Sequence, residues 1–168
     1  GATLIDVQNV WKDKKDGGRP VATVFVVDVS GSMEGTRIQA VQNAMLSARE
    51  FIKPETQVGV VEFNDTVYKR LEIGEFDLNQ QAKFAAIGED LTPGGGTAMY
   101  DGIVLGLKML DEQRALNPDV KPILVVLSDG ETTDDSVTFA QTLGYCARRR
   151  SVWNSGSGSA ALRSIRAR

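Results

Sequence analysis

The 168-residue sequence contains no histidine and only one cysteine, Cys146. Without histidine, the chain can build neither a Ser-His-Asp triad nor a His-ligated zinc site. A single cysteine excludes an internal disulfide and a multi-cysteine zinc site. Apolar runs of the roughly 20 residues needed to span a membrane are also missing, as is a recognisable N-terminal signal segment. Any metal that this chain binds must therefore be held by oxygen atoms.

Acidic residues are missing from the C-terminal fifth of the chain. All 22 Asp and Glu lie within residues 1–135, whereas residues 136–168 contain six Arg and no acid. A nucleic-acid-binding protein normally carries a basic face on its folded core, and this core is acidic, so we expect no nucleic-acid partner. Composition and charge divide the chain into an N-terminal extension (1–20), one domain (21–145) and an atypical segment rich in Arg, Ser and Gly (146–168).

The hydrophobic pattern of residues 21–127 predicts alternating strands and helices. Apolar runs rich in β-branched residues indicate strands, and apolar residues three or four positions apart indicate helices. The strands are expected at 21–27, 57–63, 66–71 and 122–127, and the helices at 36–52, 78–87 and 99–110. Asn64-Asp65 indicates a hairpin between the second and third strands. This order predicts an α/β fold with a mainly parallel sheet.

Five oxygen-bearing side chains stand where such a fold places its ligand site. Asp28, Ser30 and Ser32 follow the first strand, and Asp129 follows the strand at 122–127. In open α/β sheets the ligand crevice lies beyond the carboxyl ends of the strands. If the two strands are neighbours, both carboxylates face one crevice, and the glycine loop before Thr97 brings a third hydroxyl to the same edge. This oxygen-only set suits Mg²⁺ or Mn²⁺, with Ca²⁺ less favoured.

The charges of this set predict a site that is open to another molecule. Two carboxylates neutralise one divalent cation, and the other ligands would be neutral hydroxyls and water. Such an ion remains able to accept one more anionic oxygen. A self-contained storage site would instead use three or more carboxylates.

These motifs resemble the metal-ion-dependent adhesion site of the von Willebrand factor type A family. The resemblance rests on Asp28-Val29-Ser30-Gly31-Ser32-Met33, Gly94-Gly95-Gly96-Thr97 and Leu127-Ser128-Asp129-Gly130. It implies a Rossmann-like three-layer α/β sandwich whose mostly parallel sheet has one antiparallel edge strand. It also implies that Ser30, Ser32 and often Thr97 ligate the metal directly, while Asp28 and Asp129 act mostly through water. An Asp or Glu of a protein partner would complete the octahedron.

The resemblance favours a non-enzymatic, cation-dependent adhesion or assembly domain of bacterial type. Loops around Met33, Glu34, Met99 and Tyr100 would then set specificity, and an extracytoplasmic or cell-surface location is slightly favoured. Two alternatives remain open. One is a magnesium-dependent phosphohydrolase with Asp28 as nucleophile, for which Arg37 is the nearest phosphate clamp; the other is a scaffold with an idle metal site.

The C-terminal region departs from the family pattern. Family members follow the strand before Asp129 with a helix, another apolar strand and a last helix. Here residues 137–143 could form the helix, but residues 147–153 make no convincing buried strand. Residues 160–165 are compatible with a final helical turn or two. We therefore expect an incomplete or unusual far edge of the sheet.

Overall fold

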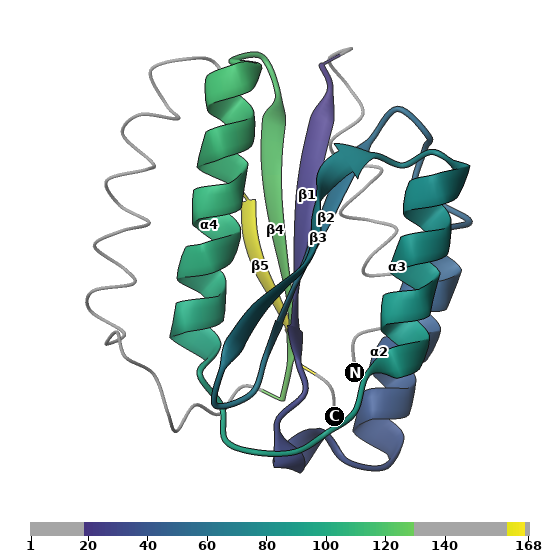
Figure 1. Ribbon diagram of the computed structural model, residues 1–168, viewed down its shortest axis with the longest axis vertical. Coiled ribbons are helices and arrows are strands. Elements are labelled where there is room, and N and C mark those ends of the chain that lie inside the picture. The colour runs from purple at the N-terminus through teal and green to yellow at the C-terminus, as the bar shows by residue number, and fades with distance from the viewer. Residues whose placement is uncertain (1–18, 130–160, 167–168) are drawn as a thin grey trace.

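The computed structural model describes residues 19–129 and 161–166 of the protein (Figure 1). Its elements follow the expected alternation of strands and helices. They are β1 (Val21–Asp28), the short 3₁₀ helix η1 (Gly31–Met33), α2 (Thr36–Ala48), β2 (Gln57–Phe63), β3 (Val67–Glu75), α3 (Leu78–Asp90), α4 (Met99–Leu116), β4 (Lys121–Ser128) and β5 (Ala161–Arg166). The expectations for residues 1–18, 137–143 and 147–153 fall outside the described residues.

The five strands form one sheet in the order β3-β2-β1-β4-β5. β1 runs parallel to both β2 and β4, β4 runs parallel to β5, and β2 and β3 are antiparallel. The expected mainly parallel sheet with one antiparallel edge strand is therefore confirmed. Because the chain reaches β2 from β1 on one side and returns to β4 on the other, the strand order reverses at β1, which is where α/β folds place their ligands.

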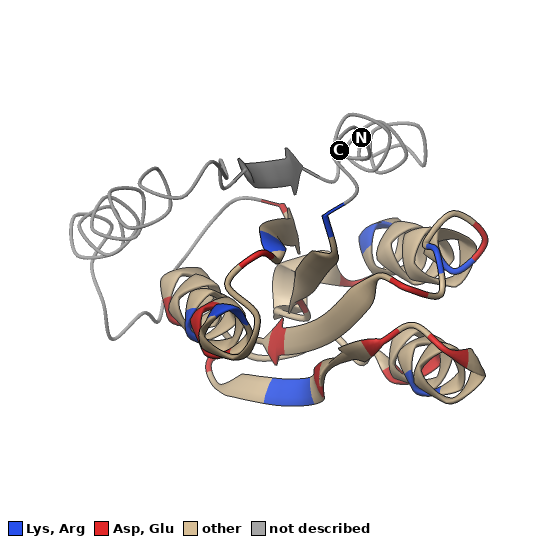
Figure 2. Cartoon of the chain, turned by 90° about the horizontal axis from the view of Figure 1, so that it is seen from above, with Lys and Arg blue, Asp and Glu red and all other residues tan. Residues whose placement is uncertain are grey.

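Helices cover both faces of the sheet (Figure 2), and two separate hydrophobic layers are buried between the helices and the sheet. Successive residues of β1 point to opposite faces, so that Phe25 and Val27 pack towards α2 and α3 while Val24 and Val26 pack towards α4. β1 is consequently apolar along almost its whole length, as expected for a strand buried on both faces. None of the helices in the described residues combines the length and apolar character that crossing a membrane requires.

The hairpin expected at Asn64-Asp65 joins β2 and β3. Asn64 makes the turn through two contacts with Thr66: its backbone N–H donates to the Thr66 carbonyl (3.0 Å), and its side-chain oxygen accepts from the Thr66 N–H (2.9 Å). The asparagine side chain thus replaces part of the backbone ladder where the chain reverses.

The helical interpretation of residues 160–165 was wrong. Residues 161–166 form β5, which pairs with β4 in parallel from Ile123↔Ala161 to Ser128↔Arg166. A six-residue segment has little intrinsic preference, so the backbone donors and acceptors along the open edge of β4 determine its conformation. That edge of the sheet therefore carries a strand in register with its neighbour.

Helix α4 approaches the sheet closely because it carries glycine where it crosses β1 and β4. A Cβ atom at Gly106 would lie 2.6 Å from Leu124 Cδ1 and 3.0 Å from Val26 Cγ2. Gly88 in α3 provides a contrast, since its Cβ would meet Met45 Cβ at an ordinary 3.4 Å. The two helical glycines thus differ in the room available for one added methyl group.

We expect Gly106→Ala to destabilise the protein and Gly88→Ala to leave its stability unchanged or raised. Alanine gains about 1 kcal/mol of helix propensity at either site, whereas overpacking at Gly106 costs about 1–3 kcal/mol. Urea unfolding of both variants measures the difference. A Gly106→Ala protein at least as stable as Gly88→Ala would contradict the close packing of α4.

Candidate metal centre

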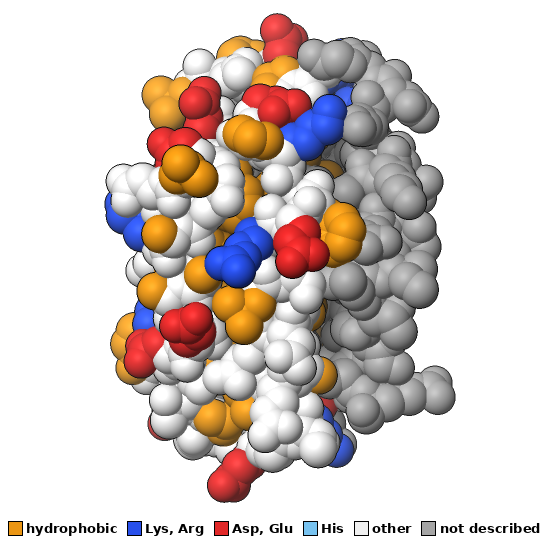
Figure 3. Space-filling view, turned by 90° about the vertical axis from the view of Figure 1, so that its right-hand side faces the viewer, with side chains coloured by type: hydrophobic (Ala, Val, Ile, Leu, Met, Phe, Trp, Pro, Cys, Tyr) orange, Lys and Arg blue, Asp and Glu red, His pale blue; other side chains and the backbone are white. Residues whose placement is uncertain are grey.

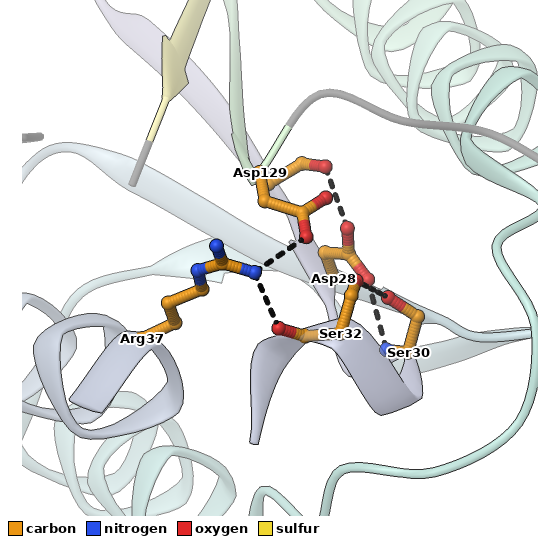
Figure 4. A network of polar contacts seen from close by, with 6 residues as sticks. Asp28, Ser30, Ser32, Arg37 and Asp129 are labelled. Atoms are coloured by element: carbon orange, nitrogen blue, oxygen red, sulfur yellow. Dashed lines mark hydrogen bonds and ion pairs between the residues drawn. The ribbon is translucent and has the colours of Figure 1, made fainter. Parts of the chain in front are cut away.

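The parallel pairing of β1 with β4 brings the two candidate carboxylates to one edge of the sheet. Val27 pairs with Leu127, so Asp28 at the end of β1 lies beside Ser128, and Asp129 follows immediately. The condition that these two strands are neighbours is therefore met. Figure 4 shows Asp28, Ser30, Ser32 and Asp129 close together beyond the strand ends.

Asp28 is completely buried, and both of its carboxylate oxygens accept hydrogen bonds. Oδ1 accepts from the Ser30 backbone N–H at 2.8 Å, and Oδ2 accepts from the Ser128 hydroxyl at 2.5 Å. Burial raises the pKa of Asp28 above its ordinary 3.8; the hydrogen bonds from Ser128 and Ser30 oppose this rise, and the nearby charge of Asp129 adds to it. The side chain is thus held in one orientation although its charge is poorly solvated.

The hydroxyl oxygens of Ser30 and Ser32 lie 3.0 Å apart. Ser30 is buried and Ser32 is exposed, because the turn of η1 carries the chain outwards between them. Adjacent ligands of an octahedral ion with metal–oxygen distances of about 2.1 Å are separated by about 3 Å. The two hydroxyls therefore have the spacing of neighbouring Mg²⁺ or Mn²⁺ ligands.

Three loops are joined by backbone hydrogen bonds around these hydroxyls. The Gly31 N–H donates to Gly95 (3.0 Å), the Gly94 N–H donates to Val29 (2.8 Å), and the Val29 N–H donates to Phe63 (2.8 Å). At the lower end of Figure 1, the turn after β1 and the connection between α3 and α4 accordingly lie side by side. Gly95 has φ +77°, a left-handed conformation that glycine adopts without strain.

The glycine loop delivers Thr97 to this edge, where its side chain is buried. Thr97 directly precedes the N-cap residue of the following helix. The N-cap is Ala98, whose backbone N–H donates to the carbonyl of Asn64 in the hairpin turn.

The hydrogen-bond and ion-pair partners of Asp28 and Asp129 were not predicted from the sequence. Arg37 Nη1 forms an ion pair with Asp129 Oδ2 at 3.3 Å and donates to the Ser32 carbonyl at 2.8 Å. Ser128 binds Asp28. The sequence could have indicated Ser128 as the partner of Asp28, because it directly precedes Asp129 and parallel pairing of the two strands places it beside Asp28. Local sequence carried no comparable signal for Arg37, whose partner is 92 residues away.

The donor set fits a hard divalent cation. Within the described residues, no group of three or more His, Cys, Asp or Glu is placed to hold a metal, and the candidate site there combines hydroxyls with two carboxylates. Asp28, Ser30, Ser32 and Asp129 supply that combination at one edge. The geometry disfavours Asp28 as a nucleophile, because a buried carboxylate with both oxygens already hydrogen-bonded cannot approach a phosphorus atom without losing these bonds.

One residue expected to set specificity lies elsewhere. Met33 is fully buried in the layer beneath α2 and α3 and cannot contact a partner. Glu34 is exposed, and Met99 and Tyr100 are partly exposed while packing against the opposite layer. Of these four residues, Glu34, Met99 and Tyr100 are therefore the ones that a partner could contact beside the site.

Comparison with known proteins identifies the family. Residues 23–131, more than half of the chain, match the model of the von Willebrand factor type A domain. The chain belongs to this family, and its Rossmann-like sandwich is the family's fold.

Individual relatives share this domain within much longer proteins. Inter-alpha-trypsin inhibitor heavy chain H2 of Mesocricetus auratus is 31% identical over 118 residues, covering 68% of this chain but 12% of the relative. The pilus adhesin SpaC of Lactobacillus rhamnosus GG is 27% identical with a TM-score of 0.57, covering 71% of this chain and 16% of that structure. The type V pili tip protein Mfa5 of Porphyromonas gingivalis is 25% identical with a TM-score of 0.54, covering 73% and 22%.

We expect Asp28→Asn to stabilise the protein in a buffer containing chelator. The amide oxygen retains the bond from Ser30, and the amide nitrogen donates to Ser128, while the buried charge is removed. Because the folded-state pKa of Asp28 is raised, the stability due to its protonation is fully present below pH 3.8 and is lost as the pH rises through the folded value. The advantage of the variant should therefore grow with pH over this range.

Urea unfolding at a series of pH values measures this effect. Asp119→Asn is the matched control, since Asp119 is exposed in the loop before β4. An Asp28→Asn protein that is less stable than wild type at neutral pH would show that the carboxylate itself holds the loop together.

Proposed function

We propose that this domain uses a divalent cation, Mg²⁺ or Mn²⁺ in preference to Ca²⁺, to bind an acidic side chain of a protein partner. The observation that carries the proposal is the 3.0 Å separation of the Ser30 and Ser32 hydroxyls beside two carboxylates. Ca²⁺ prefers six to eight oxygens at about 2.3–2.6 Å, which is more ligands than the five residues at this edge supply.

Each residue of the proposed site has a distinct role. Ser30 and Ser32 ligate the ion through their hydroxyls, and Thr97 supplies a third hydroxyl from the glycine loop. Asp28 and Asp129 balance the charge, mostly through bound water. Asp28 also orients Ser30 by accepting its backbone N–H. Since these five residues supply only two negative charges, the ion retains affinity for a carboxylate from outside.

The family and its members support an adhesive rather than an enzymatic role. A pilus adhesin and a pilus tip protein share the fold at 25–27% identity, and on this basis we propose an extracytoplasmic location. The chain spans only about an eighth of the curated relatives it matches, so the activity of a whole parent protein is not inferred from them. No general acid accompanies Asp28 among the site residues, which favours binding over hydrolysis.

The surface agrees with a protein partner rather than a nucleic acid. On the face formed by α2 and α3, acidic, basic and hydrophobic side chains are interspersed, and the described part of this face shows no continuous basic area (Figure 3). Nucleic-acid binding depends on such an area to neutralise phosphates. Binding of a single acidic side chain at the sheet edge requires no continuous basic area.

We expect Mg²⁺ and Mn²⁺ to bind with a stoichiometry of one and to raise the melting temperature by mass action. Asp129→Ala should weaken Mn²⁺ binding by at least about tenfold, as expected when a partner of the metal is lost, and should retain the wild-type circular dichroism spectrum. Isothermal titration calorimetry and thermal melting measure these effects, with Asp119→Ala as control. A wild-type melting curve that is unchanged at saturating Mn²⁺ would support an idle site.

The coordination position that the five residues leave open on the metal can be tested with acetate. Acetate added to the Mn²⁺-loaded protein should displace metal-bound water and lower the relaxation enhancement of solvent protons, whereas acetamide at the same concentration should not. If acetate has no effect although Mn²⁺ binds, the site stores the metal without presenting it to acids.

A further inference from the structure

Arg37 occupies an unusual place for a cation. It is the second residue of α2, and the N-terminal end of a helix carries partial positive charge that favours acidic side chains. The first turn of α2 contains no acid, and its N-cap is Gly35, at φ +82°. The helix itself therefore gives the guanidinium no stabilisation, and its position is explained by what it contacts beyond the helix.

Those contacts lie within the proposed metal centre. The same nitrogen of Arg37 bridges Asp129 Oδ2 (3.3 Å) and the Ser32 carbonyl (2.8 Å). The Asp129 side chain is 9% exposed and the Arg37 side chain 44%. The carboxylate is thus largely buried while the guanidinium is more exposed to solvent; Figure 4 shows Arg37 beside both Asp129 and Ser32.

The charge of Arg37 affects the binding of both the divalent cation and the partner's carboxylate. Asp28 and Asp129 in ionised form contribute −2, and Arg37 brings the total to −1. A bound divalent cation changes this total to +1, which one incoming carboxylate neutralises. Without Arg37, the total would change from −2 to zero, so the empty site would attract the cation more strongly and the loaded site would attract an acid less strongly.

We propose that Arg37 is a fixed rim cation that weakens binding of the divalent cation and strengthens capture of the partner's carboxylate. The inference rests on the proposed function and adds a specificity-determining residue to it. Through Arg37, the combined charge of Asp28, Asp129, Arg37 and the metal changes from −1 to +1 on loading, which favours acidic ligands in the loaded state. Occupancy of the metal thus becomes a requirement for adhesion.

The test compares Arg37→Gln with Arg37→Lys. Glutamine removes the charge but can still donate to the Ser32 carbonyl, and lysine retains the charge. Arg49→Gln is the matched control, because Arg49 is exposed at the opposite end of the same helix. Mn²⁺ affinity is measured by calorimetry, and acetate affinity of the Mn²⁺-saturated protein is measured by solvent proton relaxation.

For Arg37→Gln we expect Mn²⁺ affinity to rise and acetate affinity to fall, each by about fivefold at low salt, which is the effect of one partly screened unit charge at this range. Arg37→Lys should restore both values towards wild type, and 0.5 M NaCl should reduce both differences. Unchanged or weaker Mn²⁺ binding by Arg37→Gln overturns the proposal, as does unchanged acetate binding.

Urea unfolding with and without Mn²⁺ distinguishes this role from that of an ion pair that only stabilises the fold. If Arg37 only held the fold together, Arg37→Gln would lower the urea midpoint equally with chelator and with Mn²⁺. The proposed role predicts a lower midpoint in chelator and a wild-type or higher midpoint in saturating Mn²⁺. A wild-type protein that binds no Mn²⁺ refutes the proposed function together with this inference, whereas Mn²⁺ binding that Arg37→Gln leaves unchanged refutes the inference alone.

Discussion

The parallel pairing of β1 with β4 is the constraint on which the site depends. Because Val27 pairs with Leu127, Asp28 at the end of β1 and Asp129 directly after β4 lie at the same edge of the sheet, although they are about a hundred positions apart in the chain. A shift of one residue in this register would turn the side chains of one strand to the opposite faces and separate the carboxylates. The apolar layers on both sides of β1 oppose such a shift, so hydrophobic burial indirectly sets the distance between two charges.

Burial of the Asp28 carboxylate at the edge of the sheet is energetically unfavourable, and hydrogen bonds to its two oxygens offset part of this cost. A buried carboxylate is unfavourable unless its oxygens are satisfied, and Asp28 obtains both partners from groups placed by the same strand pairing, Ser30 and Ser128. The raised pKa of Asp28 shows that these bonds only partly replace the lost solvation. The loops after β1 and β2 and before α4 are held together mainly by backbone bonds, which leaves the hydroxyls of the site directed by the turns that carry them.

The balance of charge gives this edge its proposed chemistry. Hydroxyls ligate a hard cation without neutralising it, and the two carboxylates are opposed by Arg37 at the rim. A site composed in this way is poor at storing a metal and well suited to presenting one. The long relatives of the chain include proteins of pili.

The sequence alone predicted the order of the strands and helices of residues 21–128 and the candidate oxygen donors, because apolar periodicity and the Asp-x-Ser-x-Ser spacing are local properties. It did not determine β5: residues 161–166 lack a strong intrinsic preference, and only the free backbone edge of β4 makes them a strand. The burial of Met33 and the N-cap at Ala98 were likewise set by packing and by a contact with the hairpin turn. The ion pair between Arg37 and Asp129 depended entirely on tertiary structure, since a contact across 92 residues exists only after α2 and β4 have packed against one sheet.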